Sequence, residues 1–185
     1  MNKAAFLDRD GVVNEDHAYV HRIGDFKFIP GAVEALRALQ EAGFLLVIVT
    51  NQSGIARGLY SEADYQALET YMRERLAAAD VTLDSVQYCP HLPDAPLEKY
   101  RRDCDCRKPN AGMIRNAAAQ LNIDTSQSIL IGDRRSDLDA GRTAGVGRCF
   151  LVRSGVPLSD ADIRAADGVF DDLAQCVAEL LKNGS

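Results

Sequence analysis

Short apolar runs alternate along the chain with longer segments in which apolar residues recur every three to four positions. The clearest run, FLLVIVT at 44–50, is apolar almost throughout, as a strand buried on both faces of a sheet requires. The other runs are six residues long or shorter, which suits strands better than helices. The pattern predicts strands at 4–8, 44–50, 85–88, 128–133, 149–152 and 169–170.

The segments between these runs have the periodicity of helices. Pro30 and Gly31 begin the first expected helix, which runs to about residue 42 and ends at Gly43. Ser61 and Asp64 stand at the spacing of a capping box ahead of the second helix. Further helices are expected near 111–121, from about 136, and over 173–181.

Strands that alternate with helices predict an α/β fold, with a mostly parallel sheet covered by helices on both faces and a single domain over 1–185. Ligands of such sheets bind beyond the carboxyl ends of the strands. Three expected strands end there in polar groups, which are Asp8, Thr50 with Asn51, and Asp133. Each motif alone also fits a solvated turn or an ordinary polar loop, but their shared position indicates a ligand site.

The composition limits what this ligand can be. The chain has 185 residues, 46% of them apolar, and a net charge of −6, which argues against nucleic acid or a membrane surface as a partner. The apolar stretch before Asp8 is too short for a secretion signal, and no apolar run is long enough to span a bilayer. We therefore expect a cytoplasmic protein, whose cysteines serve as core residues or metal ligands before disulfides.

Phosphoryl transfer is the chemistry that uses this set of groups. Asp8 and Asp10 stand two positions apart at a strand end, so they face the same way in an extended chain. Asp8 could attack a phosphate ester and form an aspartyl-phosphate, while Asp10 protonates the leaving oxygen and later activates water. Because carboxylate and phosphate repel each other, we expect a Mg²⁺ ion held by Asp8 and Asp133, with Lys108 stabilising the transferred group.

A second set of candidate metal ligands flanks a loop. CPH at 89–91 and CDC at 104–106 supply three thiols and one imidazole, a standard tetrahedral complement for structural zinc. A disulfide leaves the histidine unexplained, and core packing conflicts with the charged neighbours of the thiols. A Zn²⁺ site would stiffen the loop and hold Arg107 and Lys108 over the carboxylates. Its ligands are expected to be Cys89, His91, Cys104 and Cys106, whereas Cys149 and Cys176 are expected in the core.

The motifs DRDGVVN, VTNQSG, RKP and IGDRRSD resemble, in order, the four motifs of the haloacid dehalogenase (HAD) superfamily of phosphotransferases. The resemblance implies a Rossmann-like core, an aspartate nucleophile, an acid/base aspartate two residues further on, and Mg²⁺. It also implies that Asp137 steadies the lysine and that the main-chain carbonyl of Asp10 joins the metal shell. The implied catalytic residues are Asp8, Asp10, Thr50 and Lys108, and the implied magnesium ligands are Asp8, Asp10 and Asp133.

Within this superfamily the chain is most similar to the D-glycero-D-manno-heptose 1,7-bisphosphate 7-phosphatases, through segments such as DHAYVH, VTNQSGIARG, YCPHLP and CDCRKPNAGM. That resemblance implies removal of the C7 phosphate, leaving a heptose 1-phosphate for the nucleotide-activated heptose of the lipopolysaccharide core. Arg107 would recognise the far phosphate, since arginine suits bidentate contacts to phosphate. The implied substrate-binding residues are Asp8, Arg9, Asp10, Asp16, His17, Ala18, Tyr19, Thr50, Asn51, Gln52, Ser53, Arg107, Lys108 and Arg134.

Two other functions compete with this one. Histidinol-phosphate phosphatases share the paired aspartates and the zinc motifs, although the long zinc loop and the segment SGIARG favour the heptose family. The other rival, a zinc-stapled module that only binds sugar phosphates, has no use for the nucleophile, the acid/base and the lysine. The gaps between the motifs are too short for a cap domain, so loops are expected to shape the site, among them a polar flap at 14–26. A single domain of this size without a cap is expected to be a monomer.

Overall fold

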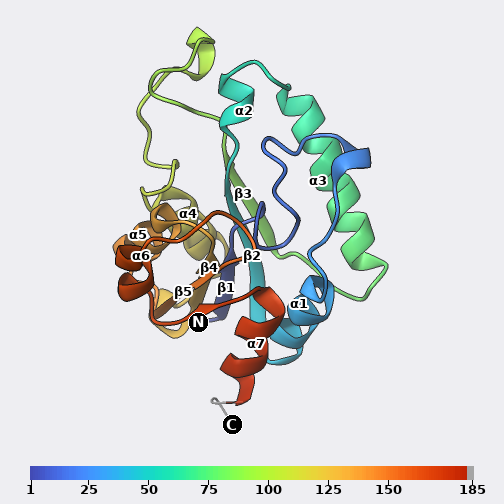
Figure 1. Cartoon of the computed structure of the whole chain (residues 1–185), viewed down its shortest axis with the longest axis vertical. Helices are drawn as coiled ribbons and strands as arrows, with labels where there is room; N and C mark the ends of the chain where they lie inside the picture. Colours follow the sequence, from blue (N-terminus) through green and yellow to red (C-terminus); the bar gives the residue numbers. More distant parts are fainter. Residues whose placement is uncertain (183–185) are drawn as a thin grey trace.

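The computed structural model describes residues 1–182, and within them six parallel strands form one sheet in the order β3-β2-β1-β4-β5-β6 (Figure 1). This is the order of a Rossmann-like fold, in which the connections change direction between β1 and β4 and leave a crevice beyond the strand ends. The predicted α/β fold is therefore confirmed. The strands are β1 Lys3–Leu7, β2 Phe44–Asn51, β3 Ser85–Cys89, β4 Ile129–Gly132, β5 Arg148–Val152 and β6 Val169–Phe170.

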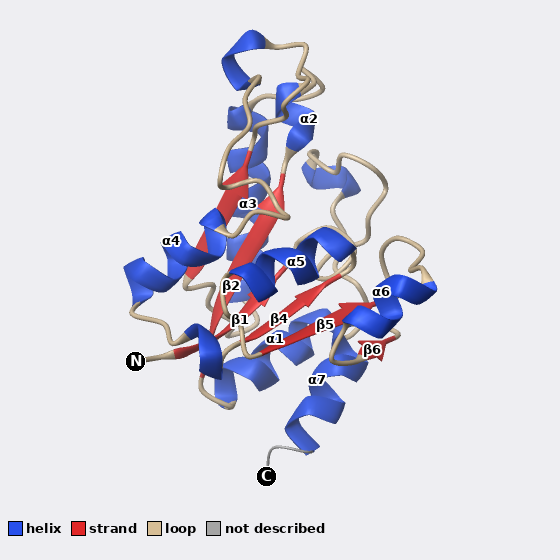
Figure 2. Cartoon of the chain, turned by 90° about the vertical axis from the view of Figure 1, so that its left-hand side faces the viewer, coloured by secondary structure: helices blue, strands red, loops and turns tan. Residues whose placement is uncertain are grey.

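Helices cover both faces of the sheet, and the residues of β1 alternate between the two cores that result (Figure 2). Ala5 and Leu7 belong to the core under α1, α3 and α7, whereas Ala4 and Phe6 belong to the core under α4 and α5. This alternation explains why the predicted strands are apolar at every position. The helices are α1 Ala32–Glu41, α2 Ser53–Ala56, α3 Glu62–Ala77, α4 Gly112–Leu121, α5 Arg135–Thr143, α6 Asp160–Ala165 and α7 Leu173–Lys182.

The local helix signals hold in the structure. The Ser61 hydroxyl accepts a hydrogen bond from Asp64 N at 3.1 Å, and the Asp64 carboxylate accepts one from Ser61 N at 2.8 Å, which completes the predicted capping box of α3. Cys149 and Cys176 are fully buried, as expected. The short helices α2 and α6 were not expected. No helix within residues 1–182 combines the length and apolar character needed to cross a bilayer.

Two long connections lie at the carboxyl ends of the strands. The segment between β1 and α1 contains the 3-10 helix Ile23–Asp25, and the segment between β3 and α4 contains the 3-10 helix Glu98–Tyr100. A third 3-10 helix, Thr125–Gln127, precedes β4. Within the described part of the chain these two connections hold no larger helix or sheet that could act as a cap, so loops and the short helix α2 border the strand ends.

Candidate active site

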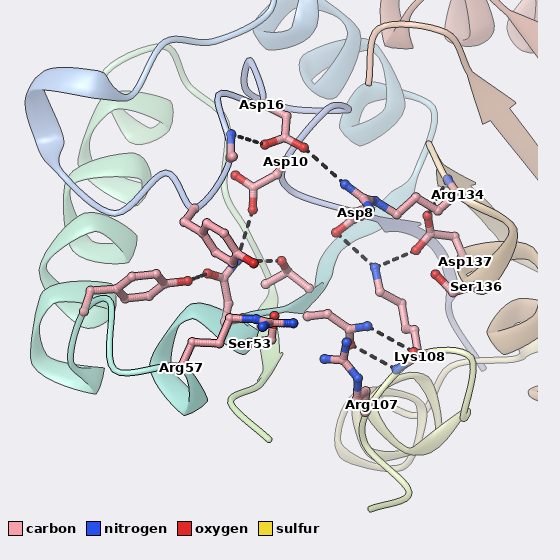
Figure 3. Close-up of a pocket in the computed structure, with 16 residues that line it drawn as sticks. Asp8, Asp10, Asp16, Ser53, Arg57, Arg107, Lys108, Arg134, Ser136 and Asp137 are labelled. Carbon is pink, nitrogen blue, oxygen red and sulfur yellow. Dashed lines mark hydrogen bonds and ion pairs between the residues drawn. The ribbon is translucent and has the colours of Figure 1, made fainter. Parts of the chain in front are cut away.

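The carboxyl ends of β1, β2 and β4 open into a cavity of about 480 Å³ (Figure 3). Asp8 directly follows β1 and Asp133 directly follows β4, and because these strands pair with each other the two carboxyl groups become neighbours. Thr50 lies near the end of β2, on the other side of β1. The residues that line the cavity are Asp8, Asp10, Asp16, Ala18, Tyr19, Thr50, Asn51, Gln52, Ser53, Arg57, Tyr60, Arg107, Lys108, Arg134, Ser136 and Asp137.

Lys108 is the buried cation of this cavity. Its Nζ lies 3.0 Å from Asp8 Oδ1 and 2.6 Å from Asp137 Oδ1, and it donates a hydrogen bond to the carbonyl of Val49 at 2.7 Å. Burial alone would lower the pKa of Lys108, but Asp137 and Asp8 more than offset this and raise it above its usual value. The ammonium is therefore charged at any physiological pH and points at Asp8.

Asn51 fixes the main chain that carries this lysine. Its amide nitrogen donates to the carbonyl of Lys108 at 3.0 Å, and its amide oxygen accepts from the N–H of Lys108 at 3.0 Å. Both polar atoms of Asn51 are thus engaged by the backbone of Lys108. The residue predicted as a substrate ligand lines the cavity, but its amide serves to position Lys108.

Asp8, Asp133 and Asp137 form a cluster of buried carboxyl groups whose oxygens lie within 4.8 Å of one another. Burial raises the pKa of Asp8 to about 8 and that of Asp133 to about 6, because a charged carboxylate is poorly solvated there. Asp133 is fully buried, and its Oδ1 accepts no hydrogen bond within residues 1–182. Asp8 and Asp137 pair with Lys108, and Asp133 Oδ1 lies 3.6 Å from Arg134 Nε. Three buried acidic groups with so few hydrogen bonds fit a hard divalent cation such as Mg²⁺.

The loop after β5 completes the surroundings of Asp133. The N–H of Val156 donates to Asp133 Oδ2 at 3.1 Å, and Gly155 lies so close that a Cβ on it would overlap this carboxyl group. Glycine at position 155 is therefore required by the close approach of the backbone to the acid. The segment FLVRSG at 150–155 thus contributes to the site through its main chain.

Asp10 is held by three donors. Arg9 contacts both of its oxygens through Nη2, at 2.8 and 2.9 Å, while Asn14 and Gln52 donate side-chain N–H groups at 3.0 and 3.1 Å. The same Arg9 Nη2 donates to the carbonyl of Val20. The carboxyl group of Asp10 therefore has a fixed orientation in the cavity beside Asp8 (Figure 3).

Two of the fourteen predicted substrate-binding residues lie outside this cavity, and the other twelve line it. Arg9 is 1% exposed and turns toward Asp10 and the carbonyl of Val20. His17 is exposed, lies 2.9 Å from Glu15, and borders a separate hollow of the flap. Arg134 is in place, and its guanidinium lies 3.3 Å from Asp16 and thereby joins the flap to the start of α5.

Four cavity residues are absent from the predicted substrate-binding set: Arg57, Tyr60, Ser136 and Asp137. Asp137 was expected to steady the lysine, and its 2.6 Å contact with Lys108 agrees with that role. Arg57 and Tyr60 line the cavity because the short helix α2 turns the chain back toward the strand ends. Within the described residues the guanidinium of Arg57 forms no hydrogen bond or ion pair, so it is available to an anion.

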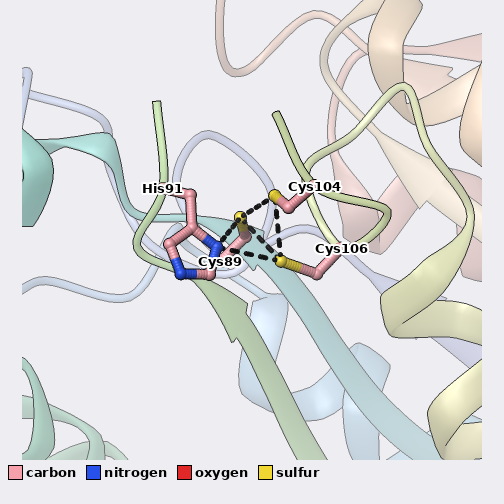
Figure 4. Close-up of side chains that lie close together, drawn as sticks. All are labelled: Cys89, His91, Cys104 and Cys106. Carbon is pink, nitrogen blue, oxygen red and sulfur yellow. Dashed lines mark hydrogen bonds between the residues drawn. The ribbon is translucent and has the colours of Figure 1, made fainter. Parts of the chain in front are cut away.

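The four predicted zinc ligands converge at the end of β3 (Figure 4). Their sulfur–sulfur distances of 3.0, 3.2 and 3.5 Å are too long for a disulfide, whose bond length is about 2.05 Å. The His91 Nδ1 lies 3.4 Å from Cys106 Sγ and 3.7 Å from Cys89 Sγ. Ligands of one tetrahedral zinc ion stand about 3.8 Å apart when Zn–S bonds are about 2.3 Å. The four ligand atoms lie within 4.8 Å of one another, so a small outward shift of the sulfurs makes the cluster compatible with that ion.

Comparison with known proteins agrees with this geometry. Residues 105–176 match the model of the HAD-hydrolase-like family. A D,D-heptose 1,7-bisphosphate phosphatase from B. bronchiseptica, whose structure contains magnesium and phosphate, superposes with a TM-score of 0.83 and 34% identity, over 98% of this chain and 99% of that one. The fold, the strand-end carboxyl groups and the buried lysine define a phosphatase of the HAD superfamily.

Relatives of higher sequence identity show which family of HAD phosphatases the chain belongs to. The D-glycero-beta-D-manno-heptose-1,7-bisphosphate 7-phosphatase of Escherichia coli K12 is 48% identical over 92% of this chain and 90% of its own length. The enzyme of the same name from Haemophilus influenzae is 50% identical over 94% of both chains. The chain belongs to the family of D-glycero-beta-D-manno-heptose-1,7-bisphosphate 7-phosphatases.

Proposed function

We propose that this enzyme removes the C7 phosphate of D-glycero-beta-D-manno-heptose 1,7-bisphosphate and leaves the heptose 1-phosphate. The observation that carries the proposal is the position of Asp8, at the end of β1, 3.0 Å from the buried ammonium of Lys108 and beside Asp133. A carboxylate so placed can attack phosphorus while a cation balances the charge of the phosphoryl group. The beta configuration follows the names of the relatives that are 48% and 50% identical.

The reaction divides between two aspartates. An oxygen of Asp8 forms a bond to phosphorus as the bond between phosphorus and the C7 oxygen breaks, and Asp10, in its acid form, gives its proton to that oxygen. In the second step Asp10 takes a proton from water as the water oxygen attacks phosphorus and releases Asp8. Thr50, whose hydroxyl oxygen accepts a hydrogen bond from Gln52 at 2.9 Å, retains its own proton to donate to a phosphoryl oxygen.

Asp8 and Asp133, with the main-chain carbonyl of Asp10, would hold the Mg²⁺ ion. The ion would neutralise the carboxyl groups that burial disfavours in the charged state, and it would lower the charge that Asp8 meets on the phosphate. Asp137 belongs to the same cluster, but one of its oxygens is 2.6 Å from Lys108. We assign it to holding that lysine.

A structural zinc ion would occupy the cluster of three cysteines and His91. Cys106 is followed directly by Arg107 and Lys108, and Arg107 Nη1 donates to the carbonyl of His91 at 3.2 Å. Cys106 as a zinc ligand would therefore restrain the segment that carries both cations, away from the substrate. A reducing compartment suits the three thiols, all of which are unpaired. The cytoplasmic location and the monomeric state stay predictions.

The second phosphate distinguishes the proposed substrate from histidinol phosphate. Arg57 and Arg107 line the cavity together, and in Figure 3 both guanidinium groups lie on the side below Asp8. Neither forms an ion pair with a carboxylate within residues 1–182. Two unneutralised guanidinium groups attract a second phosphate and disfavour the ammonium of histidinol. The cavity therefore favours a bisphosphate.

The Asp8→Asn variant tests the proposed nucleophile. Its amide cannot form an acyl phosphate, so Mg²⁺-dependent phosphate release is expected to fall by at least about 10³-fold, while thermal unfolding shows a folded protein. Surviving phosphate release would contradict the assignment of Asp8. The substrate is tested by kcat/KM for both anomers of the heptose bisphosphate and for histidinol phosphate, where a preference for histidinol phosphate would overturn the proposal.

A further inference from the structure

A buried tyrosine in the cavity wall forms no hydrogen bond with Asp8 or Lys108. Tyr60 is 7% exposed, and its hydroxyl donates a hydrogen bond of 2.6 Å to Gln52 Oε1. The other end of this glutamine faces the reaction, because Gln52 Nε2 donates to Asp10 Oδ2 at 3.1 Å and to Thr50 Oγ1 at 2.9 Å. One amide group thus joins the acid/base residue, the phosphate-binding hydroxyl and the tyrosine.

The orientation of this amide decides what it can do. With its NH₂ group toward the cavity, Gln52 stabilises the carboxylate of Asp10 and occupies a lone pair of Thr50, which directs the threonine proton to the substrate. With the amide turned over, its oxygen would face Asp10 Oδ2 and repel it. Gln52 is 2% exposed, so water cannot readily satisfy the oxygen that points away from the cavity.

Tyr60 supplies the hydrogen bond that this oxygen requires. Burial raises its pKa to about 12, so the phenol keeps its proton and remains a donor at neutral pH. Two packing contacts fix the ring. The ring of His21, in the flap, stacks on it with centroids 4.7 Å apart and planes 5° from parallel. On the α2 side Gly54 lies against the ring, and a Cβ at that position would overlap it.

We propose that Tyr60 is a positioning residue, which holds the Gln52 amide in the one orientation that supports both Asp10 and Thr50. The inference rests on the proposed phosphatase mechanism, since it acts through the two residues to which that mechanism assigns proton transfer and phosphate binding. It accounts for the tyrosine at the cavity wall and for the glycine beneath its ring.

The test is the Tyr60→Phe variant, which keeps the stacked ring and removes only the hydroxyl. Tyr65→Phe is a matched control, because Tyr65 is buried in the same small cluster and its hydroxyl has no hydrogen-bond partner within residues 1–182. We expect Tyr60→Phe to lower kcat by about 10-fold with KM changed less than about 2-fold, since small misplacements of catalytic groups reduce turnover strongly. The Tyr65→Phe enzyme is expected to match the wild type.

A double-mutant cycle with Gln52→Ala separates positioning from a structural role. If Tyr60 acts through the glutamine, Tyr60→Phe costs about 10-fold in the wild-type background and less than about 2-fold when Gln52 is alanine. An equal loss in both backgrounds, or a kcat for Tyr60→Phe equal to that of Tyr65→Phe, would overturn the inference.

The failure of this inference can be told from failure of the proposed function. All ratios can be measured on p-nitrophenyl phosphate as well as on the heptose bisphosphate, so they do not depend on the identity of the sugar. A wild-type enzyme that hydrolysed other phosphate esters, but not the heptose bisphosphate, would contradict the proposed substrate while the cycle still decided the role of Tyr60. A wild-type protein that released phosphate from none of them would end both proposals.

Discussion

Replacing Lys108 by methionine removes a positive charge from the most buried part of the cavity. The side chain is 2% exposed, with Asp8 at 3.0 Å and Asp137 at 2.6 Å from its ammonium. Methionine has a similar length, so the change affects mainly charge and hydrogen bonding. It leaves the buried carboxyl groups of Asp8 and Asp137 without their common cation, beside the third buried acid Asp133.

The magnitude follows from this geometry. Removing one partner of a buried ion pair costs about 3–5 kcal/mol, because the remaining charge is neither solvated nor compensated. In a chain of this size each kcal/mol shifts Tm by about 2–4 °C, so we expect the metal-free Lys108→Met protein to melt roughly 6–20 °C lower. Loss of the electrostatic contact to the phosphoryl group is expected to reduce kcat by about 10²–10³-fold.

The stability loss should depend on pH. Burial raises the pKa of Asp8 to about 8, and Lys108 is the group that holds it down, so in the variant Asp8 keeps its proton to a higher pH. A carboxyl group whose folded pKa exceeds its unfolded value is stabilising below about pH 4, and this stability disappears as the pH rises through the folded pKa. The contribution of Asp8 to the deficit of Lys108→Met is therefore expected to make the deficit larger near about pH 9 than near about pH 5.

The measurement is thermal unfolding with EDTA and with excess Mg²⁺, across this pH range. Excess Mg²⁺ should restore part of the lost Tm, because it neutralises the same carboxyl groups, but it should not restore kcat. Lys99→Met is the control, since Lys99 is exposed and lies 3.4 Å from Glu62, and its Tm should not change. A Lys108→Met protein that melts with the control at about pH 9 would refute the reasoning.

Three further predictions concern the cysteine cluster, the two arginines of the cavity and the buried cysteines of the core. Removal of zinc by a strong chelator should lower Tm and turnover even with Mg²⁺ in excess, whereas unchanged values would contradict the role of the cluster. Arg57→Ala and Arg107→Ala should each lower kcat/KM for the bisphosphate by about 10-fold or more but change that for p-nitrophenyl phosphate little, and equal losses on both substrates would exclude recognition of a second phosphate. Because burial raises the pKa of Cys149 to about 11 and that of Cys176 to about 12, both thiols should resist alkylation near about pH 8 in the folded protein, and their rapid modification would show that they are not buried.

The strands and most helices could be predicted because their signals are local. A strand buried on both faces must be apolar at every position, and the capping box of Ser61 and Asp64 needs only its own four residues. The helix α6 carries the same signal, since Ser159 and Asp162 form an equivalent capping box, and it could have been found. The helix α2 has four residues, one of them Gly54, and no side-chain cap, so no periodic pattern marks it.

The candidate site was predictable where a motif and a strand end coincide, as at Asp8 and Asp133. Arg9 shows where neighbourhood in sequence misleads, because alternation between Asp8 and Asp10 turns its side chain to the opposite side of the chain. The part played by Asn51 depends on Lys108, which is 57 positions away, so only the folded structure reveals that its amide holds the lysine backbone.

The two hydrogen bonds between Asn51 and the backbone of Lys108 have a consequence for the segment 92–103, which lies between the proposed zinc ligands. The four proposed ligand side chains bring the two ends of this segment together. Asn51 holds the backbone of Lys108, two residues beyond the last of these ligands. The segment still touches the helices beside the cavity, because the Leu97 N–H donates to the carbonyl of Ala56 in α2 at 3.4 Å and the Tyr100 hydroxyl donates to Glu62 at 2.6 Å. Changes of length or composition in this segment therefore act on α2 and on Arg57, which follows that helix, before they act on Lys108, so the position of Arg57 can drift while the catalytic ammonium stays in place.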